Sequence, residues 1–420
     1  MLNIDELAQS LKISATKKLV IAFSGGLDSY VLLYAIAQIS ITTQDYQIRA
    51  IHIDHGLQAV SSQWSVQCEA ICKVLNIPCE IISLNLLVPK SKSLEAAARE
   101  ARYQAFKESL QTGETLLTAQ HQDDQAETLL IQLFRGAGIN GLAAMPALRN
   151  FGKGTHLRPL LNVSRESLEQ YAKYHALNFI EDPSNQDQRF DRNYFRHEII
   201  PHLKQRWPSM DKVLTRAAYH QAEAKNLLAE YIEQDLPLLA GSRVGTLSIK
   251  QLKLLSEARC KAVIRYFLDQ KGFLAPSEKK LAHIITDVLN SQDDAMPCVH
   301  WQGIEVRRYQ DDLHAITPLD KHDEKQCISW NISKPLYIPS LKRILKTTLL
   351  DDIKVLGMKK EQNIEIRFRQ GGEKIYQAQR KRTIALKKYF QEMHIPPWER
   401  ERTPLIYIDN QLVAIVFDGE

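Results

Sequence analysis

Four short apolar runs alternate with longer segments of helical spacing over the first 135 residues of the chain. The runs are residues 19–24, 48–54, 79–84 and 116–119, and the helical segments are 27–40, 62–75, 93–110 and 123–134. Strands that alternate with helices form a parallel sheet covered by helices on both faces. Ligands of such sheets bind beyond the carboxyl ends of the strands. The pattern therefore predicts an α/β domain with its chemistry just after Phe23, Ile53 and Ala119.

The pattern changes after residue 136. Helical segments follow at 168–176, 194–207, 210–235 and 277–289, strand-like pieces at 246–249, 303–309, 364–368 and 405–408, and a linker at 332–339. We therefore predict three domains: a parallel-sheet, Rossmann-like domain at 1–212, a mainly helical middle domain at 213–330 and a small α+β C-terminal domain at 340–420.

Composition places the chain among ordinary globular proteins, with 44% hydrophobic and 25% charged residues in 420. The longest strongly apolar stretch, residues 30–37, is far too short to cross a bilayer, and the N-terminus has no secretory pattern. Six scattered cysteines do not form a disulfide framework. These features predict a cytoplasmic protein with reduced thiols and no membrane association.

The positive charge is concentrated near the C-terminus. Residues 342–402 hold 16 Lys or Arg and 8 Asp or Glu, a balance of +8, whereas the whole chain has +5, so the rest sums to −3. Aromatic residues lie in the same stretch, and this mixture suits a phosphate backbone with exposed bases. A solvated face of a small domain is the alternative explanation.

A glycine-serine loop follows the first predicted strand and opens a helix. It reads Ser24, Gly25, Gly26, Leu27, Asp28, Ser29. A helix N-terminus offers unpaired N–H groups to an anion, and glycines let the backbone approach phosphate closely. Asp28 beside polyphosphate implies an intervening Mg²⁺; stabilisation of the helix dipole is its alternative role.

The hexapeptide resembles the SGGxDS loop of the N-type ATP pyrophosphatase (PP-loop) superfamily. Further segments in the same order resemble the tRNA(Ile)-lysidine synthetase family: residues 53–57, 95–103, 118–128, 135–142, 181–185, 192–196, 371–373, 386–392 and 395–405. Residues 215–330 add little motif signal. One departure is Gln120, where many relatives have a second histidine, and this puts a role for that position in doubt.

The resemblance implies a specific reaction. A similar enzyme uses ATP to adenylate the C2 oxygen of the wobble cytidine in an isoleucine tRNA with a CAU anticodon. The ε-amine of free lysine then attacks C2 and AMP leaves. The lysidine formed pairs with A instead of G, so decoding and charging switch from methionine to isoleucine.

Four residues are the candidates for catalysis under this resemblance. Asp28 and Asp124 are candidates to hold Mg²⁺ or orient lysine, and Arg99 to stabilise the leaving pyrophosphate. His121 or a carboxylate is the candidate base for the lysine amine. The alternatives are helix N-terminal acids for Asp123 and Asp124, and a surface ion pair with Glu95 for Arg99.

Other residues are candidates for binding. Asp54 and His55 are expected to border the nucleotide, with a purely structural turn as the alternative. We expect Arg192, Asn193 and Arg196 to contact RNA or the active-site loop, with ion pairs to Asp187 or Asp191 as the alternative. The basic residues Arg380, Arg382, Lys387 and Lys388 are expected to hold tRNA phosphates and set the salt dependence of binding.

Three rival functions stay open at this level. A tRNA-thiolating enzyme would need a persulfide cysteine or a CxxC set, which the sequence lacks. A GMP synthetase-like amide ligase would need an ammonia source and would leave the basic C-terminus unexplained. A non-catalytic RNA-binding protein would form no AMP. The sequence does not determine the oligomeric state, a homodimer included, or the residues that reject methionine tRNA.

Overall fold

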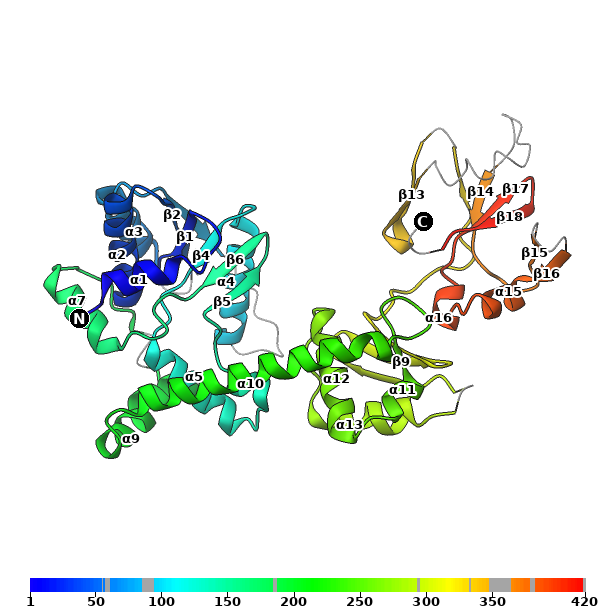
Figure 1. The fold of residues 1–420 in the computed structure, drawn as a ribbon. Helices are drawn as coiled ribbons and strands as arrows, with labels where there is room; N and C mark the ends of the chain where they lie inside the picture. The colour runs from blue at the N-terminus through cyan, green and yellow to red at the C-terminus, as the bar shows by residue number, and fades with distance from the viewer. Residues whose placement is uncertain are drawn as a thin grey trace. The chain divides into compact units, whose positions relative to one another are not determined.

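The computed structural model describes residues 1–420 except 55, 57–60, 85–93, 184–186, 293–294, 332–333, 347–363, 378–381 and 418–420. The chain divides into two units, Met1–Tyr231 and Ile232–Glu420, and each is described by itself (Figure 1). The division into 1–212, 213–330 and 340–420 stays a prediction.

The first unit contains a six-stranded sheet in the order β3-β2-β1-β4-β6-β5. Its strands are β1 (Lys18–Ala22), β2 (Gln47–Asp54), β3 (Cys79–Ser83), β4 (Thr115–Leu117), β5 (Leu148–Phe151) and β6 (Gly154–Leu157). All neighbours pair in parallel except β5 and β6, which form an antiparallel hairpin. The predicted parallel α/β domain is confirmed, and the hairpin is an addition that the sequence pattern did not predict.

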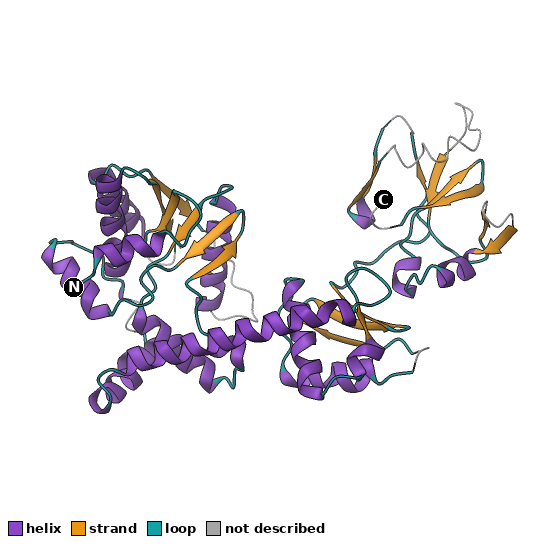
Figure 2. Ribbon diagram, in the orientation of Figure 1, coloured by secondary structure: helices purple, strands orange, loops and turns teal. Residues whose placement is uncertain are grey.

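The two faces of this sheet are filled by alternate residues of its strands. Leu19 and Ile21 of β1 pack into one cluster, which holds α1 (Ile4–Leu11), α2 (Leu27–Thr43), α3 (Ser61–Val74) and α7 (Arg165–Tyr174) against the sheet. Val20 points the other way and packs with Phe106 of α4 (Leu94–Ser109). Helices therefore cover both faces of the sheet (Figure 2).

Further helices of this unit pack together beyond the sheet. They are α5 (Gln122–Phe134), α6 (Ile139–Leu142), α8 (Asp191–Tyr194), a π-helical turn (Phe195–Ile199), α9 (Ile200–Arg206) and α10 (Met210–Leu239). Leu130, Ile200 and Met210 share a small apolar cluster that fixes α5 against α9 and the start of α10. This packing brings residues 190–206 onto the beginning of α5, where the predicted catalytic residues lie.

The second unit begins with helices packed on an antiparallel sheet. The sheet has the order β7-β10-β9-β8, with β7 (Leu247–Ser248), β8 (Cys298–Trp301), β9 (Ile304–Tyr309) and β10 (Asp312–Ile316). Its core includes residues of α12 (Glu257–Gln270) and α13 (Glu278–His283). The prediction of a mainly helical middle region is therefore wrong in part, because β9 alternates buried apolar residues with charged ones and gives no apolar run.

The described residues in the rest of the second unit include short antiparallel strands and two short α-helices. A four-stranded sheet pairs β11 (Ile328–Ser329), β14 (Ile364–Arg367), β17 (Leu405–Ile408) and β18 (Gln411–Ile415). β12 (Leu336–Ile338) pairs with β13 (Arg343–Leu345), and β15 (Lys374–Gln377) pairs with β16 (Arg382–Ala385). The two helices are α15 (Leu386–Glu392) and α16 (Pro397–Arg400). The segment predicted as a linker contains β12 (Leu336–Ile338). No helix in the described part of the chain has the length and apolarity needed to span a membrane.

Candidate active site

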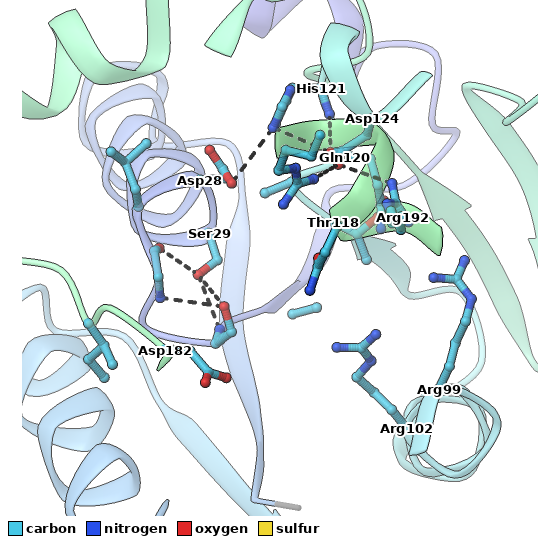
Figure 3. A pocket seen from close by; sticks show the side chains of 18 of the residues that line it. Asp28, Ser29, Arg99, Arg102, Thr118, Gln120, His121, Asp124, Asp182 and Arg192 are labelled. Carbon is cyan, nitrogen blue, oxygen red and sulfur yellow. Dashed lines mark hydrogen bonds and ion pairs between the residues drawn. The ribbon is translucent and has the colours of Figure 1, made fainter. Parts of the chain in front are cut away.

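A cavity of about 1180 Å³ opens at the carboxyl ends of β1 and β4. The chain leaves β1 for β2 and β3 on one side and returns to β4 on the other, so this is the point where the strand order reverses. Ligands of open parallel sheets bind at such a point. The loop at residues 24–29, the end of β2, α4, the start of α5 and residues 179–204 all contribute to the cavity wall (Figure 3).

The loop at residues 24–29 has the geometry of an anion cradle. Gly25 has a φ of +81°, and a Cβ there would lie 2.5 Å from Cδ1 of Ile180, so only glycine fits. Gly26 occupies the N-cap of α2, where no side chain caps the first N–H groups. Ser29 Oγ donates to the Gly26 carbonyl and stiffens the turn. Leu27 is buried in the core, so its contribution to a ligand is its backbone N–H.

Asp28 faces the cavity from the first turn of α2. Both of its carboxylate oxygens accept hydrogen bonds from Nη1 of Arg165, at 2.7 and 2.6 Å. His121 Nε2 lies 3.8 Å from Asp28 Oδ2 (Figure 3). Burial raises the pKa of Asp28, and the neighbouring His121 and Arg165 offset only part of this effect. The positive groups around Asp28 therefore do not fully offset the cost of burying its negative charge.

His121 is the N-cap of α5 and lies between three carboxylates. Its side chain is 3% exposed, and Nε2 is 3.5 Å from Asp124 Oδ2. Nδ1 is 3.8 Å from Asp123 Oδ1, and it is buried without a hydrogen-bond partner among the described residues. Lys204 Nζ donates to Asp123 Oδ2 at 2.9 Å and holds that carboxylate on the far side of the ring. The imidazole is thus fixed beside the phosphate loop with a free nitrogen.

Two arginines from the 190s reach the same place. Arg192 and Arg196 each donate from Nη2 to Asp124 Oδ1 at 3.0 Å, and each donates from Nε to Glu127 at 2.7 Å. Burial would raise the pKa of Asp124, but His121, Arg192 and Arg196 outweigh it and hold the pKa below its ordinary value. Both arginines therefore pair with carboxylates of α5 that the prediction did not name, and their contact with RNA or with the active-site loop stays a prediction.

The remaining candidates line the cavity more loosely. Arg99 extends from α4 with its guanidinium 5.2 Å from the centre of the Tyr103 ring (Figure 3). Asp54 lies at the end of β2 and accepts from the Gly56 N–H at 2.9 Å. His55 lies outside the described residues, as does the side chain of Glu95, the alternative partner of Arg99. Asn193 lines the cavity and donates to the Asp187 carbonyl at 2.9 Å.

Comparison with known proteins identifies the family of this chain. Residues 2–203 match a family model described as PP-loop domain, residues 247–314 the TilS substrate binding domain and residues 364–417 the TilS substrate C-terminal domain. A tRNA(Ile)-lysidine synthase of Coxiella burnetii is 42% identical over 407 residues, which cover 96% of this chain and 89% of that protein. The chain belongs to the tRNA(Ile)-lysidine synthase family.

Two further relatives show the same extent of similarity. The tRNA(Ile)-lysidine synthase of Legionella pneumophila strain Paris is 40% identical and covers 95% of this chain and 91% of its own. That of Edwardsiella ictaluri is 38% identical, with 96% and 91% covered. The resemblance found in the sequence is therefore confirmed, and the enzyme is an ATP-dependent ligase.

The four basic residues that are predicted to hold tRNA phosphates lie in the segment matched by the C-terminal family model, residues 364–417. Lys387 and Lys388 are exposed on α15, and Arg382 is exposed on β16, 4.0 Å from Glu392. Arg380 lies outside the described residues. The contacts of these side chains with tRNA stay a prediction.

Sequence reasoning missed two residues that hold the synthase site together. Arg165 binds Asp28 across 137 positions of sequence, and nothing in the local pattern around residue 165 points to residue 28. Glu127, which is 1% exposed, could have been found. Asp124 and Glu127 lie three residues apart on one helix face, and Arg192 and Arg196 lie four residues apart on another helix face. Two acids and two arginines with these spacings can pair with each other.

Proposed function

We propose that the cavity of the first unit carries both half-reactions of lysidine synthesis on an isoleucine tRNA with a CAU anticodon. In the first, the C2 oxygen of the wobble cytidine attacks the α-phosphorus of ATP, the α–β phosphoanhydride bond breaks and pyrophosphate leaves. In the second, the ε-amine of lysine attacks C2 and loses a proton, the C2–oxygen bond breaks and AMP leaves.

The loop at residues 24–29 binds the phosphates of ATP in this proposal. The uncapped N–H groups at the start of α2 and the hydroxyls of Ser24 and Ser29 supply donors, and Gly25 lets them approach. Asp54 and His55, at the end of β2, border the rest of the nucleotide.

The residues present fit Mg²⁺ that arrives with the nucleotide. No group of three or more His, Cys, Asp or Glu forms a metal cage in the described part of the chain. Mg²⁺ is typically held by one or two carboxylates together with substrate phosphates. Asp28 is the carboxylate short of positive charge, so it is the first candidate, and Asp124 is the second. Bound there, the ion would neutralise charge that develops on pyrophosphate.

Arg99 stabilises the same charge from the other wall. Its guanidinium contacts the Tyr103 ring and no carboxylate whose position the structure describes, so its charge is available to phosphate oxygens.

His121 accepts the proton that the attacking amine loses. Its ring is buried next to Asp28 of the phosphate loop, and its Nδ1 lacks a hydrogen-bond partner within the described residues. Asp124 lies 3.5 Å from the other nitrogen, and hydrogen bonds from Arg192 and Arg196 favour its anionic form when His121 is neutral. An anionic Asp124 is therefore suited to orient the lysine ammonium group before it loses a proton.

The tRNA is held by two groups of residues. Arg192, Asn193 and Arg196 contact RNA near the reacting nucleotide, while Arg382, Lys387 and Lys388, together with Arg380, hold phosphates away from it. The buried contacts of Arg192 and Arg196 support a role in positioning, and the exposure of Lys387 and Lys388 supports a role in affinity.

The observation that carries the proposal is the position of His121 between Asp28 of the phosphate loop and Asp124. Its test supplies labelled lysine, ATP and a CAU-anticodon isoleucine tRNA transcript. We expect label in the RNA only when ATP is present, with one AMP formed for each lysine. Absence of label, or equal labelling of a methionine tRNA, would refute the proposal. A non-catalytic RNA-binding protein would bind the transcript and form no AMP.

A further inference from the structure

A chain of hydrogen bonds runs from the exposed Arg149 and the buried Arg158 to Gln120 on the cavity wall. Arg149 Nε and Arg158 Nη2 both lie 3.3 Å from His156 Nδ1. His156 Nε2 lies 2.7 Å from Thr118 Oγ1, and Thr118 Oγ1 contacts Gln120 Oε1. None of these contacts involves the phosphate loop, and the reaction described above makes no use of them.

The direction of this chain is fixed by chemistry. A guanidinium only donates, so Nδ1 of His156 accepts and its proton is on Nε2. Thr118 Oγ1 therefore accepts from Nε2–H, and the only acceptor in the described structure for its own proton is Gln120 Oε1. The amide of Gln120 is thereby oriented: its carbonyl oxygen faces Thr118, and its NH₂ group is left for the cavity.

The centre of this hydrogen-bond series is buried, and its donors and acceptors do not exchange roles near neutral pH. His156 is fully buried, and Arg158 and Thr118 are nearly so. Burial, reinforced by the charges of Arg158, Arg149 and Arg99, lowers the pKa of His156 to about 2. The imidazole therefore stays neutral, and its two nitrogens keep their separate roles as acceptor and donor.

Gln120 itself is only half-buried and lines the cavity next to His121. Figure 3 shows it with Thr118 and His121 on the wall that faces Asp28. A side chain held this way, on the strand end that carries the proposed base, presents two N–H donors at the reacting end of the cavity. The structure describes no partner for them.

We propose that Gln120 is a specificity-determining residue that donates a hydrogen bond to the N3 acceptor of the wobble cytosine, with Thr118 and His156 as its positioning residues. This inference rests on the proposed function. Cytosine presents an acceptor at N3, next to the reacting C2 oxygen, whereas uracil carries a donor at N3. An amide held with its NH₂ group outward would thus favour cytosine, and one free to flip would not. A phosphate oxygen of ATP is the other acceptor in the cavity, and the test separates the two.

The first test exchanges the donor for an acceptor. Gln120→Glu keeps the shape and the contact of an oxygen with Thr118. We measure the affinity of the full chain for the CAU transcript and for the same transcript with U at the wobble position, and ATP binding without RNA. Wild type should prefer C by about 10- to 100-fold. The variant should lose this preference while ATP binding stays within about 2-fold. Weaker ATP binding with an unchanged C/U ratio, or no change in either, would overturn the proposal.

The second test acts at a distance from the substrate and guards against misfolding of the first variant. Thr118→Val removes the hydroxyl that orients the amide, and Thr118→Ser keeps it. The C/U preference should fall about 3- to 10-fold in the valine variant and recover in the serine variant. Gln120→His should also keep most of the preference, because an imidazole can accept from Thr118 with one nitrogen and donate with the other. Equal C/U ratios for the valine and serine variants would refute the positioning role.

These outcomes are distinct from failure of the proposed function. If the wild-type chain transfers no lysine to the CAU transcript, the ligase proposal itself fails, whatever the C/U ratios are. If lysine is transferred and the ratios do not respond, only the role of Gln120 fails.

Discussion

Two groups of charged residues, one in each unit, differ in their surroundings. In the first unit, Arg192 and Arg196 come from one helical segment and meet Asp124 and Glu127 in a buried network with every hydrogen bond at 2.7 to 3.0 Å. In the second unit, the lysines of α15 are exposed to solvent. The same kind of charge therefore fixes geometry in one place and is free to bind a flexible polyanion in the other.

This difference predicts how each region responds to change. A buried ion pair is sensitive to single atoms because each charge depends on its partner for solvation. An exposed lysine is already solvated, so its loss changes affinity through counterion release and leaves the fold intact. Substitutions in the two units can test this difference, and the largest effect is expected at the phosphate loop.

Asp28→Ala should abolish AMP release. We expect a loss of at least about 10³-fold in rate, because the residue proposed to neutralise phosphate charge through Mg²⁺ is removed. Binding of the tRNA should stay within about 2-fold, since Asp28 lies at the ATP loop. The measurements are AMP formation by chromatography and tRNA binding by filter retention. If AMP formation and tRNA binding were lost together, the ATP site and the tRNA-binding surface would not be independent of each other.

Glu127→Gln should destabilise the first unit by about 2–3 kcal/mol. The carboxylate is buried and accepts from both arginines, whereas these side chains are 25% and 35% exposed, which reduces the penalty below that of a fully buried pair. Urea unfolding measures the effect. The matched control is Asp45→Asn, which breaks the exposed Lys17–Asp45 pair and should leave the transition unchanged. Similar shifts for the two variants would contradict the distinction between buried and exposed charges.

Replacing Lys387 and Lys388 with glutamine should weaken tRNA binding about 10-fold near 0.15 M salt. The slope of log affinity against log salt should fall by about 2, one for each phosphate that a lysine no longer neutralises. The rate at saturating tRNA should not change. The double variant Lys12→Gln, Lys73→Gln is the matched control. It removes the same amount of charge from two exposed lysines of the first unit, one directly after α1 and one in α3. An unchanged slope in the α15 variant would refute its assigned role.

Asp28→Asn should raise the thermal midpoint of the ligand-free protein by a few degrees. The folded pKa of Asp28 is raised, so ionisation above its ordinary pKa of 3.8 works against the fold, and the penalty is complete above the folded pKa. The amide removes that penalty, and Arg165 keeps Glu169 as a partner. The gain should shrink as the pH falls toward 4. A lower midpoint at pH 7 would show that Arg165 already compensates the charge.

The sequence predicted the parts of this site that local pattern determines. The phosphate loop, the strand ends and the helix that begins after His121 follow from apolar runs and glycine positions within a few residues of each other. The hairpin β5–β6 was missed because β5 and β6 are four residues each, with Arg149, Asn150 and His156 among them, and neither forms an apolar run. The middle sheet was underestimated for the same reason.

What the sequence left open are contacts between segments far apart in the chain. The Arg165–Asp28 pair depends on how α7 packs against α2, and the pairing of Arg192 and Arg196 depends on the fold of residues 190–206 over α5. Periodicity describes one element at a time, so it placed both arginines on a helix face without identifying the carboxylates opposite. The Thr118–Gln120 contact needed His156 of a strand that was not predicted.

The contact between Gly25 and Ile180 has a consequence for the order of events during synthesis. The Ile180 N–H donates to the Gly25 carbonyl at 2.9 Å, and the Ile180 side chain fills the space where a Cβ of residue 25 would be. A nascent chain that has emerged only as far as α4 already contains the strand, the loop and the helix of the nucleotide site. That shorter chain lacks Ile180, which packs against Gly25 of the loop. The closed form of this loop therefore cannot be complete until residue 180 has left the ribosome.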